Sequence, residues 1–184
     1  MKYERRLVNL VLGDSIMMDI LRTVRSLDLP EWWIGAGFVR NKVWDVLCNL
    51  PQQTGEQRDV DVLYFNPTNT SEAVDNQLNI RLEQQLPEVT WECVNQARTH
   101  RWHDHPPYSS SLEALSTWVE TATAIAVRLN DDDTIEVAAP FGLDDLFAMI
   151  VRPTPRASLD DFERRYKEKG WLTRWPKLRI IHDK

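Results

Sequence analysis

The chain has 184 residues, of which 42% are hydrophobic and eight are tryptophans, and its net charge is −6. This composition excludes a disordered chain, and the length suits one domain with a single core. No apolar run approaches the roughly 20 residues that a membrane-spanning helix needs, and the first residues lack the features of a secretory signal. The cysteines, Cys48 and Cys93, lie in apolar surroundings without metal-ligand spacing, so we expect reduced core residues in a cytoplasmic protein.

The charge is unevenly distributed along the chain. Residues 152–184 contain 10 Lys and Arg against 5 Asp and Glu, whereas residues 1–151 contain 12 against 23. A basic segment can attract polyanions. The simpler interpretation is that this segment forms a solvated helix followed by an extended end that docks on the acidic body. The acidic body argues against broad nucleic-acid binding. We therefore expect one domain over residues 1–184, with a core over about 14–153 and a basic C-terminal helix and tail over 154–184.

In chain order, the first predicted helix begins at Asp14 or Ser15 and ends before Pro30. Trp32 to Ile34 is a bulky apolar run that is too short for a helix, so it predicts a buried strand. Gly35-Ala36-Gly37 then permits a tight turn, because two of its positions lack a Cβ atom. Helical spacing follows over residues 38–47, and the free N–H groups at the start of this helix would favour a phosphate in the turn.

A polar loop over residues 51–58 leads to Asp59-Val60-Asp61-Val62, which has the alternation of a strand. Residues two apart in a strand face the same side, so both carboxylates project together while both valines enter the core. Neighbouring carboxylates repel each other unless a cation lies between them. Because Mg²⁺ prefers carboxylates together with substrate phosphates, the pattern predicts a Mg²⁺ or Mn²⁺ site at Asp59 and Asp61.

The second half of the chain alternates short helices and strands. A capping box from Asn69 to Glu72 predicts a helix through Gln85. Residues 89–94 are predicted to form a third strand, and residues 98–111 a polar loop. Ser110 and Glu113 form a second capping box, and the remaining elements are a hairpin (124–129 and 134–138), an apolar helix (143–151), a charged helix (158–169, closed by Gly170) and a final edge strand. This order suits an α+β domain with a small mixed sheet flanked by helices.

The strand, glycine turn, helix and D-x-D strand together resemble the DNA polymerase β-like nucleotidyltransferase superfamily. Its tRNA nucleotidyltransferases and poly(A) polymerases begin with G-G-x-x-R-D followed by D-h-D-h, to which Gly35, Gly37, Arg40, Asp59 and Asp61 are similar. The chain also resembles a small bacterial nucleotidyltransferase-like family through residues 91–100, 120–129 and 139–147.

Two positions depart from the superfamily pattern. Asn41 stands where the tRNA enzymes have Asp, and Ala36 stands where polymerase β relatives often have Ser. These departures do not affect the expected fold. They do mean that the resemblance does not identify the substrate.

The resemblance implies a polymerase β-like fold and a metal-dependent transfer of a nucleotidyl group from a nucleoside triphosphate (NTP) to an unidentified acceptor. Gly35, Ala36 and Gly37 would admit the triphosphate, and Arg40 would neutralise it. Such enzymes commonly place a third carboxylate on a further strand. Glu92 is the acid in that position, although alternation alone makes an ordinary solvent-facing residue equally consistent.

Further residues near this strand are weaker candidates. The amides of Asn95 and Gln96 would suit a base or ribose, and Arg98 would reach the phosphates from the third strand. Asp144 and Asp145 are alternative acids, although their position better suits the first turn of a helix. His100, His103 and His105 with Asp104 lack the spacing of a zinc site, so an ordinary polar loop is the simpler interpretation.

Other functions are alternatives to this interpretation. A Rossmann dinucleotide site would need G-x-G-x-x-G, and position 40 is Arg, so this alternative is disfavoured. A catalytically inactive nucleotide-binding module, or a protein-interaction module on the same fold, stays possible on the sequence because the third acid is not defined. Metal-dependent NTP binding without release of pyrophosphate would distinguish the inactive module from an enzyme.

Overall fold

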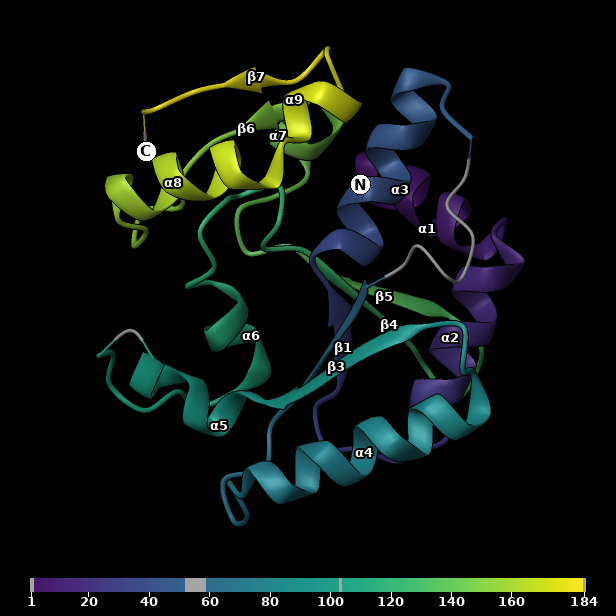
Figure 1. Ribbon diagram of the computed structural model, residues 1–184. Coiled ribbons are helices and arrows are strands. Elements are labelled where there is room, and N and C mark those ends of the chain that lie inside the picture. The colour runs from purple at the N-terminus through teal and green to yellow at the C-terminus, as the bar shows by residue number, and fades with distance from the viewer. Residues whose placement is uncertain (1, 52–58, 103, 184) are drawn as a thin grey trace.

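The computed structural model describes residues 2–51, 59–102 and 104–183 (Figure 1). The predicted polar loop before the D-x-D strand lies largely outside these residues, as does His103. A five-stranded mixed sheet with the order β3-β2-β1-β4-β5 forms the centre, and a separate pair, β6 and β7, lies next to the C-terminal helices. The predicted α+β architecture, a small mixed sheet flanked by helices, is confirmed.

Two helices precede the first strand. Helix α1 (Lys2–Leu12) was not predicted, and it packs against α2 and β5. Helix α2 (Ser15–Arg25) begins where expected, because the side chain of Asp14 accepts a hydrogen bond from the backbone N–H of Met17 at 3.0 Å. The helix ends several residues before Pro30, so the proline is not its stop signal.

The central strands match the predicted series. Strand β1 (Trp33–Gly35) leads into α3 (Gly37–Cys48), and β2 (Asp59–Tyr64) pairs antiparallel with β1. Helix α4 (Glu72–Gln85) then connects β2 to β3 (Thr90–Asn95), which runs parallel to β2. The N-cap of α4 is Ser71 rather than the predicted Asn69, whose side chain instead accepts from the backbone N–H of Ser71.

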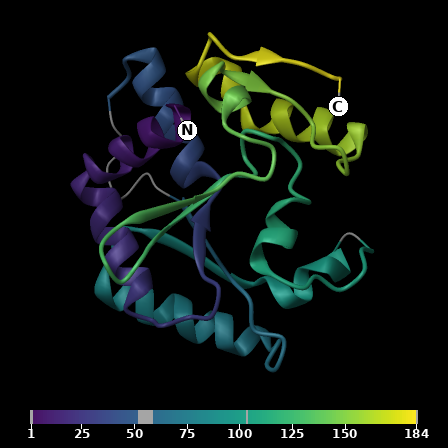
Figure 2. The ribbon, with the colours of Figure 1, turned by 180° about the vertical axis from the view of Figure 1, so that it is seen from behind.

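After β3 the chain forms short elements. The predicted polar loop contains α5 (Gln96–Thr99) and the 3₁₀ turn η2 (His100–Trp102), and Ser110 caps α6 (Ser111–Leu115) as expected. The predicted hairpin is present as β4 (Ala126–Leu129) and β5 (Ile135–Ala138), next to the N-terminal helices in the rear view (Figure 2).

The C-terminal quarter differs most from expectation. The predicted helix over residues 143–151 is one turn, α7 (Asp144–Phe147), followed by strand β6 (Ile150–Val151). Helix α8 (Leu159–Lys169) is capped by Ser158 and Gly170 as predicted. After α9 (Trp171–Arg174), strand β7 (Arg179–Ile180) pairs with β6, so it adds nothing to the edge of the central sheet. Within the described residues, every helix is too short or too polar to cross a lipid bilayer.

The two faces of the central sheet have different character. Val60, Val62 and Tyr64 alternate along β2 and enter the main core, which also contains residues of α1, α2 and α4. On the opposite face, Leu63 joins a smaller apolar cluster with Trp33 and Leu115 of α6. Asp59 and Asp61 occupy this second face by the same alternation, so the register of β2 turns both carboxylates away from the main core.

Candidate active site

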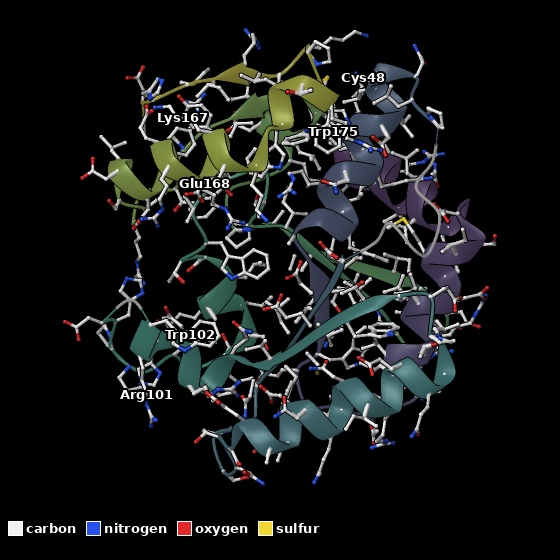
Figure 3. The ribbon with its side chains drawn as sticks, viewed as in Figure 1. Cys48, Arg101, Trp102, Lys167, Glu168 and Trp175 are labelled. Carbon is white, nitrogen blue, oxygen red and sulfur yellow. The ribbon has the colours of Figure 1, made fainter. Side chains whose placement is uncertain are left out.

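A cleft of about 640 Å³ opens over the second face of the sheet. Strands β2 and β3 form its floor, the turn before α3 and the first part of α3 form one wall, and α8 and α9 form another. Figure 3 shows Trp102 on the η2 side and Trp175 on the α9 side, and both residues line the cleft. This volume falls within the range of pockets that bind small molecules, and it suffices for a nucleotide.

Three carboxylates lie on the floor of the cleft. Asp61 on β2 is the register partner of Glu92 on β3, and Asp59 lies two residues earlier on the same face of β2. Trp91 and Cys93 are buried in the core, so the alternation of β3 directs Glu92 to the cleft. The structure therefore places the three acids that the sequence indicated on the same face of the sheet.

The pKa of Asp61 is raised to about 6, first by burial and then by the charge of Glu92, with a smaller contribution from Asp59. Arg40 and Arg165 act in the opposite direction and do not cancel this rise. The two arginines thus compensate the negative charge of the acidic floor only in part, and carboxylate oxygens are ligands that Mg²⁺ prefers. In the part of the chain that the structure describes, no three His, Cys, Asp or Glu side chains already converge as metal ligands. The acids fit a divalent cation in charge and ligand type, without forming a preassembled metal centre.

The turn between β1 and α3 differs from the predicted glycine turn. Its left-handed residue is Ala36, with φ 51° and ψ −125°, whereas Gly37 starts α3 without a positive φ. Gly35 pairs with Asp61 in the sheet and does not line the cleft. A Cβ atom at Gly35 would lie 3.2 Å from the Trp118 ring, so packing is what requires a glycine there. Ala36 and Gly37 do line the cleft.

We expect Ala36→Gly to raise the free energy of unfolding by about 1 kcal/mol. A non-glycine residue with this backbone conformation destabilises the folded state by about 1–3 kcal/mol, which glycine would relieve. Glycine itself destabilises the folded state by about 0.5–1 kcal/mol, because it loses more chain entropy on folding. Urea denaturation measures the difference. Ala73→Gly is the control, because Ala73 lies in the first turn of α4 and its replacement should destabilise. Destabilisation by both substitutions would show that Ala36 carries no strain.

Arg40 lies in α3 at the wall of the cleft and is only 6% exposed. Its guanidinium carbon is 4.4 Å from the ring centroid of Trp171, Nη1 donates to Thr123 Oγ1 at 2.8 Å, and Nη2 donates to Asn41 Oδ1 at 3.1 Å. Burial lowers the pKa of Arg40 to about 10, so the side chain stays protonated at neutral pH. Arg40 therefore supplies a fixed positive charge opposite the acids.

The structure does not bring Asn95 and Arg98 to the cleft, which corrects their predicted role in nucleotide binding. Asn95 is fully buried, and its amide bonds to backbone groups of Asn66 and Ala97, among others. Arg98 forms a buried ion pair with Asp75 of α4. Asp75 also accepts a hydrogen bond from the hydroxyl of Tyr64 at 2.6 Å. These groups join α4 to β2 and β3 behind the sheet, so their role is structural.

The other polar candidates also lie outside the acidic floor. Asp145 accepts from Thr121 Oγ1 and Arg152 Nε, and neither it nor Asp144 lines the cleft. Nδ1 of His105 lies 2.7 Å from the hydroxyl of Tyr108, and none of the described histidines belongs to a cluster of three metal-ligand groups. These residues provide neither a third acid nor a zinc site in the described residues.

Sequence reasoning missed several side chains of the cleft wall, among them Trp118, Thr123, Arg165 and Trp171. Thr123 lies within the family-like segment 120–129, and that resemblance was the available signal. Arg165 lies in a charged helix that resembles any solvated helix in sequence, so no local pattern distinguishes it from its neighbours.

A mixed sheet that presents a D-x-D pair beside a strand–turn–helix unit is the architecture of polymerase β-like nucleotidyltransferases. A family described as "Nucleotidyltransferase" matches residues 22–180, and the chain belongs to this family. A search of curated protein sequences gives no match.

Solved structures agree with this assignment. The chain is 30% identical to a protein whose NMR structure is described as revealing a CCA-adding enzyme head domain, with a TM-score of 0.87 over 97% of this chain and 96% of the other. A CCA-adding enzyme complexed with CTP is 15% identical, with a TM-score of 0.58 over 95% of this chain. The Thermotoga maritima CCA-adding enzyme complexed with tRNA is 17% identical, with a TM-score of 0.58 over 97%. The chain spans 43% and 42% of these two enzymes, so they share its fold over less than half their length.

Proposed function

We propose that the protein is a metal-dependent nucleotidyltransferase. It binds an NTP with Mg²⁺ or Mn²⁺ and transfers the nucleotidyl group to a hydroxyl of an acceptor, with release of pyrophosphate. The observation that carries this proposal is the placement of Asp59, Asp61 and Glu92 on one face of the sheet, opposite the buried positive charge of Arg40. A carboxylate floor facing a cationic wall suits a metal–triphosphate complex, whose two parts have opposite charge.

The residues of the cleft have distinct roles in this proposal. Asp59 and Asp61 would hold the metal, which when bound neutralises phosphate charge and activates the attacking oxygen. Glu92 accepts the proton of the acceptor hydroxyl as that hydroxyl approaches between β2 and β3. The backbone at Ala36 and Gly37 lies along the phosphates, and Arg40 stabilises their charge from behind.

The likeness to CCA-adding enzymes suggests the first ligands to test. Those enzymes have been solved with CTP, with ATP and with tRNA. This chain has an acidic body, which gives no independent support for a nucleic-acid acceptor. The acceptor class therefore stays open between an RNA end, a protein side chain, a small alcohol and an antibiotic. A reaction that consumes NTP would take place in the cytoplasm, where we expect the protein.

The test is a screen of the four NTPs with Mg²⁺ or Mn²⁺, in which nucleotide binding and pyrophosphate release are both followed. We expect metal-dependent binding of at least one NTP and, with a suitable acceptor, release of pyrophosphate. Binding without release across a broad panel of acceptors would favour the inactive nucleotide-binding module, a function consistent with acids that are not preassembled around a metal. Absence of metal-dependent binding for all four NTPs would overturn the proposed function.

A further inference from the structure

The cleft wall contains a second arginine, from the C-terminal segment. Arg165 in α8 lines the cleft, and its Nε lies 2.9 Å from Oε1 of Glu120. Glu120 is completely buried in the turn before β4, where its carbonyl accepts hydrogen bonds from the backbone N–H groups of Thr123 and Ala124. The contact is an ion pair without the geometry of a hydrogen bond, so a buried carboxylate attracts the inner edge of this guanidinium.

The outer edge of Arg165 remains available to a ligand. The side chain is 38% exposed, and among the described residues none forms a hydrogen bond with Nη1 or Nη2. Both terminal nitrogens can thus donate into the cleft, in the fork geometry that matches two phosphate oxygens. The ion pair through Nε orients this fork and reduces the entropy lost when it binds.

Arg40 lacks this freedom. Both of its terminal nitrogens already donate to protein oxygens, its ring-facing surface is covered by Trp171, and it is almost fully buried. Its remaining nitrogen, Nε, is buried without a partner. Arg40 can act on a ligand through its charge, whereas Arg165 can also contact one directly.

Arg165 is also close enough to the acids to share their ligand. Arg165 lines the same cleft of about 640 Å³ as Asp61, Glu92 and Arg40. An anion that bridges a metal on the floor and the cationic wall would therefore meet Arg165.

We propose that Arg165 is a direct phosphate-binding residue of this cleft and that Glu120 is the positioning residue that orients it. This inference rests on the proposed function for its natural ligand, the triphosphate of an NTP. It assigns part of the binding site to the C-terminal segment, which the charge pattern alone indicated to be a solvated helix.

The experiment is calorimetric titration of wild type and Arg165→Ala with metal-free inorganic tripolyphosphate, and separately with NTP and Mg²⁺. A charged hydrogen bond contributes about 1.5–3 kcal/mol, so Arg165→Ala should weaken tripolyphosphate binding about 10- to 100-fold. Arg164→Ala is the matched control, since Arg164 is the neighbouring residue, is 65% exposed and pairs with Asp161 at 2.7 Å. Its affinity should equal that of wild type.

Two further variants keep the test valid if Arg165→Ala alters folding. Arg165→Lys retains the charge without the fork, so it should bind with intermediate affinity. Glu120→Gln should weaken tripolyphosphate binding several-fold in wild type and have no further effect in Arg165→Ala, because Glu120 acts through Arg165. Unchanged or tighter binding by Glu120→Gln alone would overturn the positioning role, and circular dichroism checks the fold of each variant.

The outcomes separate this inference from the proposed function. If wild type and Arg165→Ala bind NTP and tripolyphosphate equally well, the inference is wrong and the proposed function is unaffected. If tripolyphosphate binds in an Arg165-dependent way but no NTP binds with metal, the phosphate site stands and the proposed function is wrong. If wild type binds neither ligand, both are wrong.

Discussion

Asp61→Asn is expected to abolish Mg²⁺-dependent nucleotide binding and, at pH 7, to stabilise the metal-free protein by about 3 kcal/mol. The loss follows because a neutral amide replaces the carboxylate that lies at the centre of the acidic floor. The gain follows because Asp61 is partly buried beside Glu92 and Asp59, and its ionised form is unfavourable in the absence of a cation. A raised pKa of about 6, against 3.8 in the unfolded chain, corresponds to this energy at about 1.4 kcal/mol per unit.

The pH dependence of this stabilisation has a definite sign. Between about pH 4 and pH 6 the folded protein binds a proton at Asp61 that the unfolded chain has released, so stability falls as pH rises through this window. Asp61→Asn removes this contribution. The variant and wild type should therefore have similar stability at pH 4 and differ fully above pH 6.

Urea denaturation at pH 4, 6 and 7.5, with calorimetry of Mg²⁺ and NTP, measures both effects. Asp131→Asn is the control, because Asp131 is an exposed carboxylate in the β4–β5 turn and lies outside the cleft. The control should change neither stability nor ligand binding. Retained Mg²⁺-dependent nucleotide binding in a folded Asp61→Asn protein would contradict the assignment of Asp61 to the metal.

Glu92→Gln is expected to lower turnover about a hundredfold or more while leaving NTP affinity largely unchanged. General-base catalysis contributes about 10²- to 10⁴-fold, and an amide cannot accept the proton of the acceptor hydroxyl. The geometry supports this role, since Glu92 is exposed in the cleft and is the register partner of Asp61 on the neighbouring parallel strand. Single-turnover kinetics with the acceptor found in the screen separates the chemical step from binding.

Glu88→Gln is the matched control for this substitution. Glu88 is an exposed acid just before β3 and does not line the cleft, so its replacement should leave turnover at the wild-type value. If Glu92→Gln also turns over normally, the proton is accepted elsewhere and the chemistry depends on the two aspartates alone. If instead Glu92→Gln loses metal affinity, Glu92 is a metal ligand rather than a base.

The C-terminal segment is the part of the chain whose role differs most between the sequence prediction and the structure. Arg174 and the indole N–H of Trp175 both donate to the buried carboxylate of Asp45 in α3, at 3.1 Å and 2.8 Å. Arg165 forms an ion pair with the buried carboxylate of Glu120, with Nε 2.9 Å from Oε1. The basic segment is therefore attached to the body by specific buried partners, and it completes one wall of the cleft.

The sequence by itself determined the strands of the central sheet, the D-x-D motif and the face on which Asp59 and Asp61 lie. These features depend on local periods: alternation in β2 sends Val60 and Val62 inward and Asp61 outward whatever the partner strand. The same alternation in β3 places Glu92 on one face and Trp91 and Cys93 on the other. By itself it does not decide which of these two faces is buried in the core. The family resemblance rested on these same local motifs, so the nucleotidyltransferase class was predictable.

Only the tertiary structure decided which cationic side chains reach the cleft. Arg98 lies just after β3 and was the nearest basic candidate in sequence, but α4 covers that side of the sheet and Asp75 binds Arg98 there. Arg165 is more than 100 residues from Asp61 along the chain, and it reaches the cleft because α8 docks on the turn that carries Glu120. A periodic pattern defines the face of an element, whereas the partner of that face depends on how distant elements pack, which no local spacing encodes.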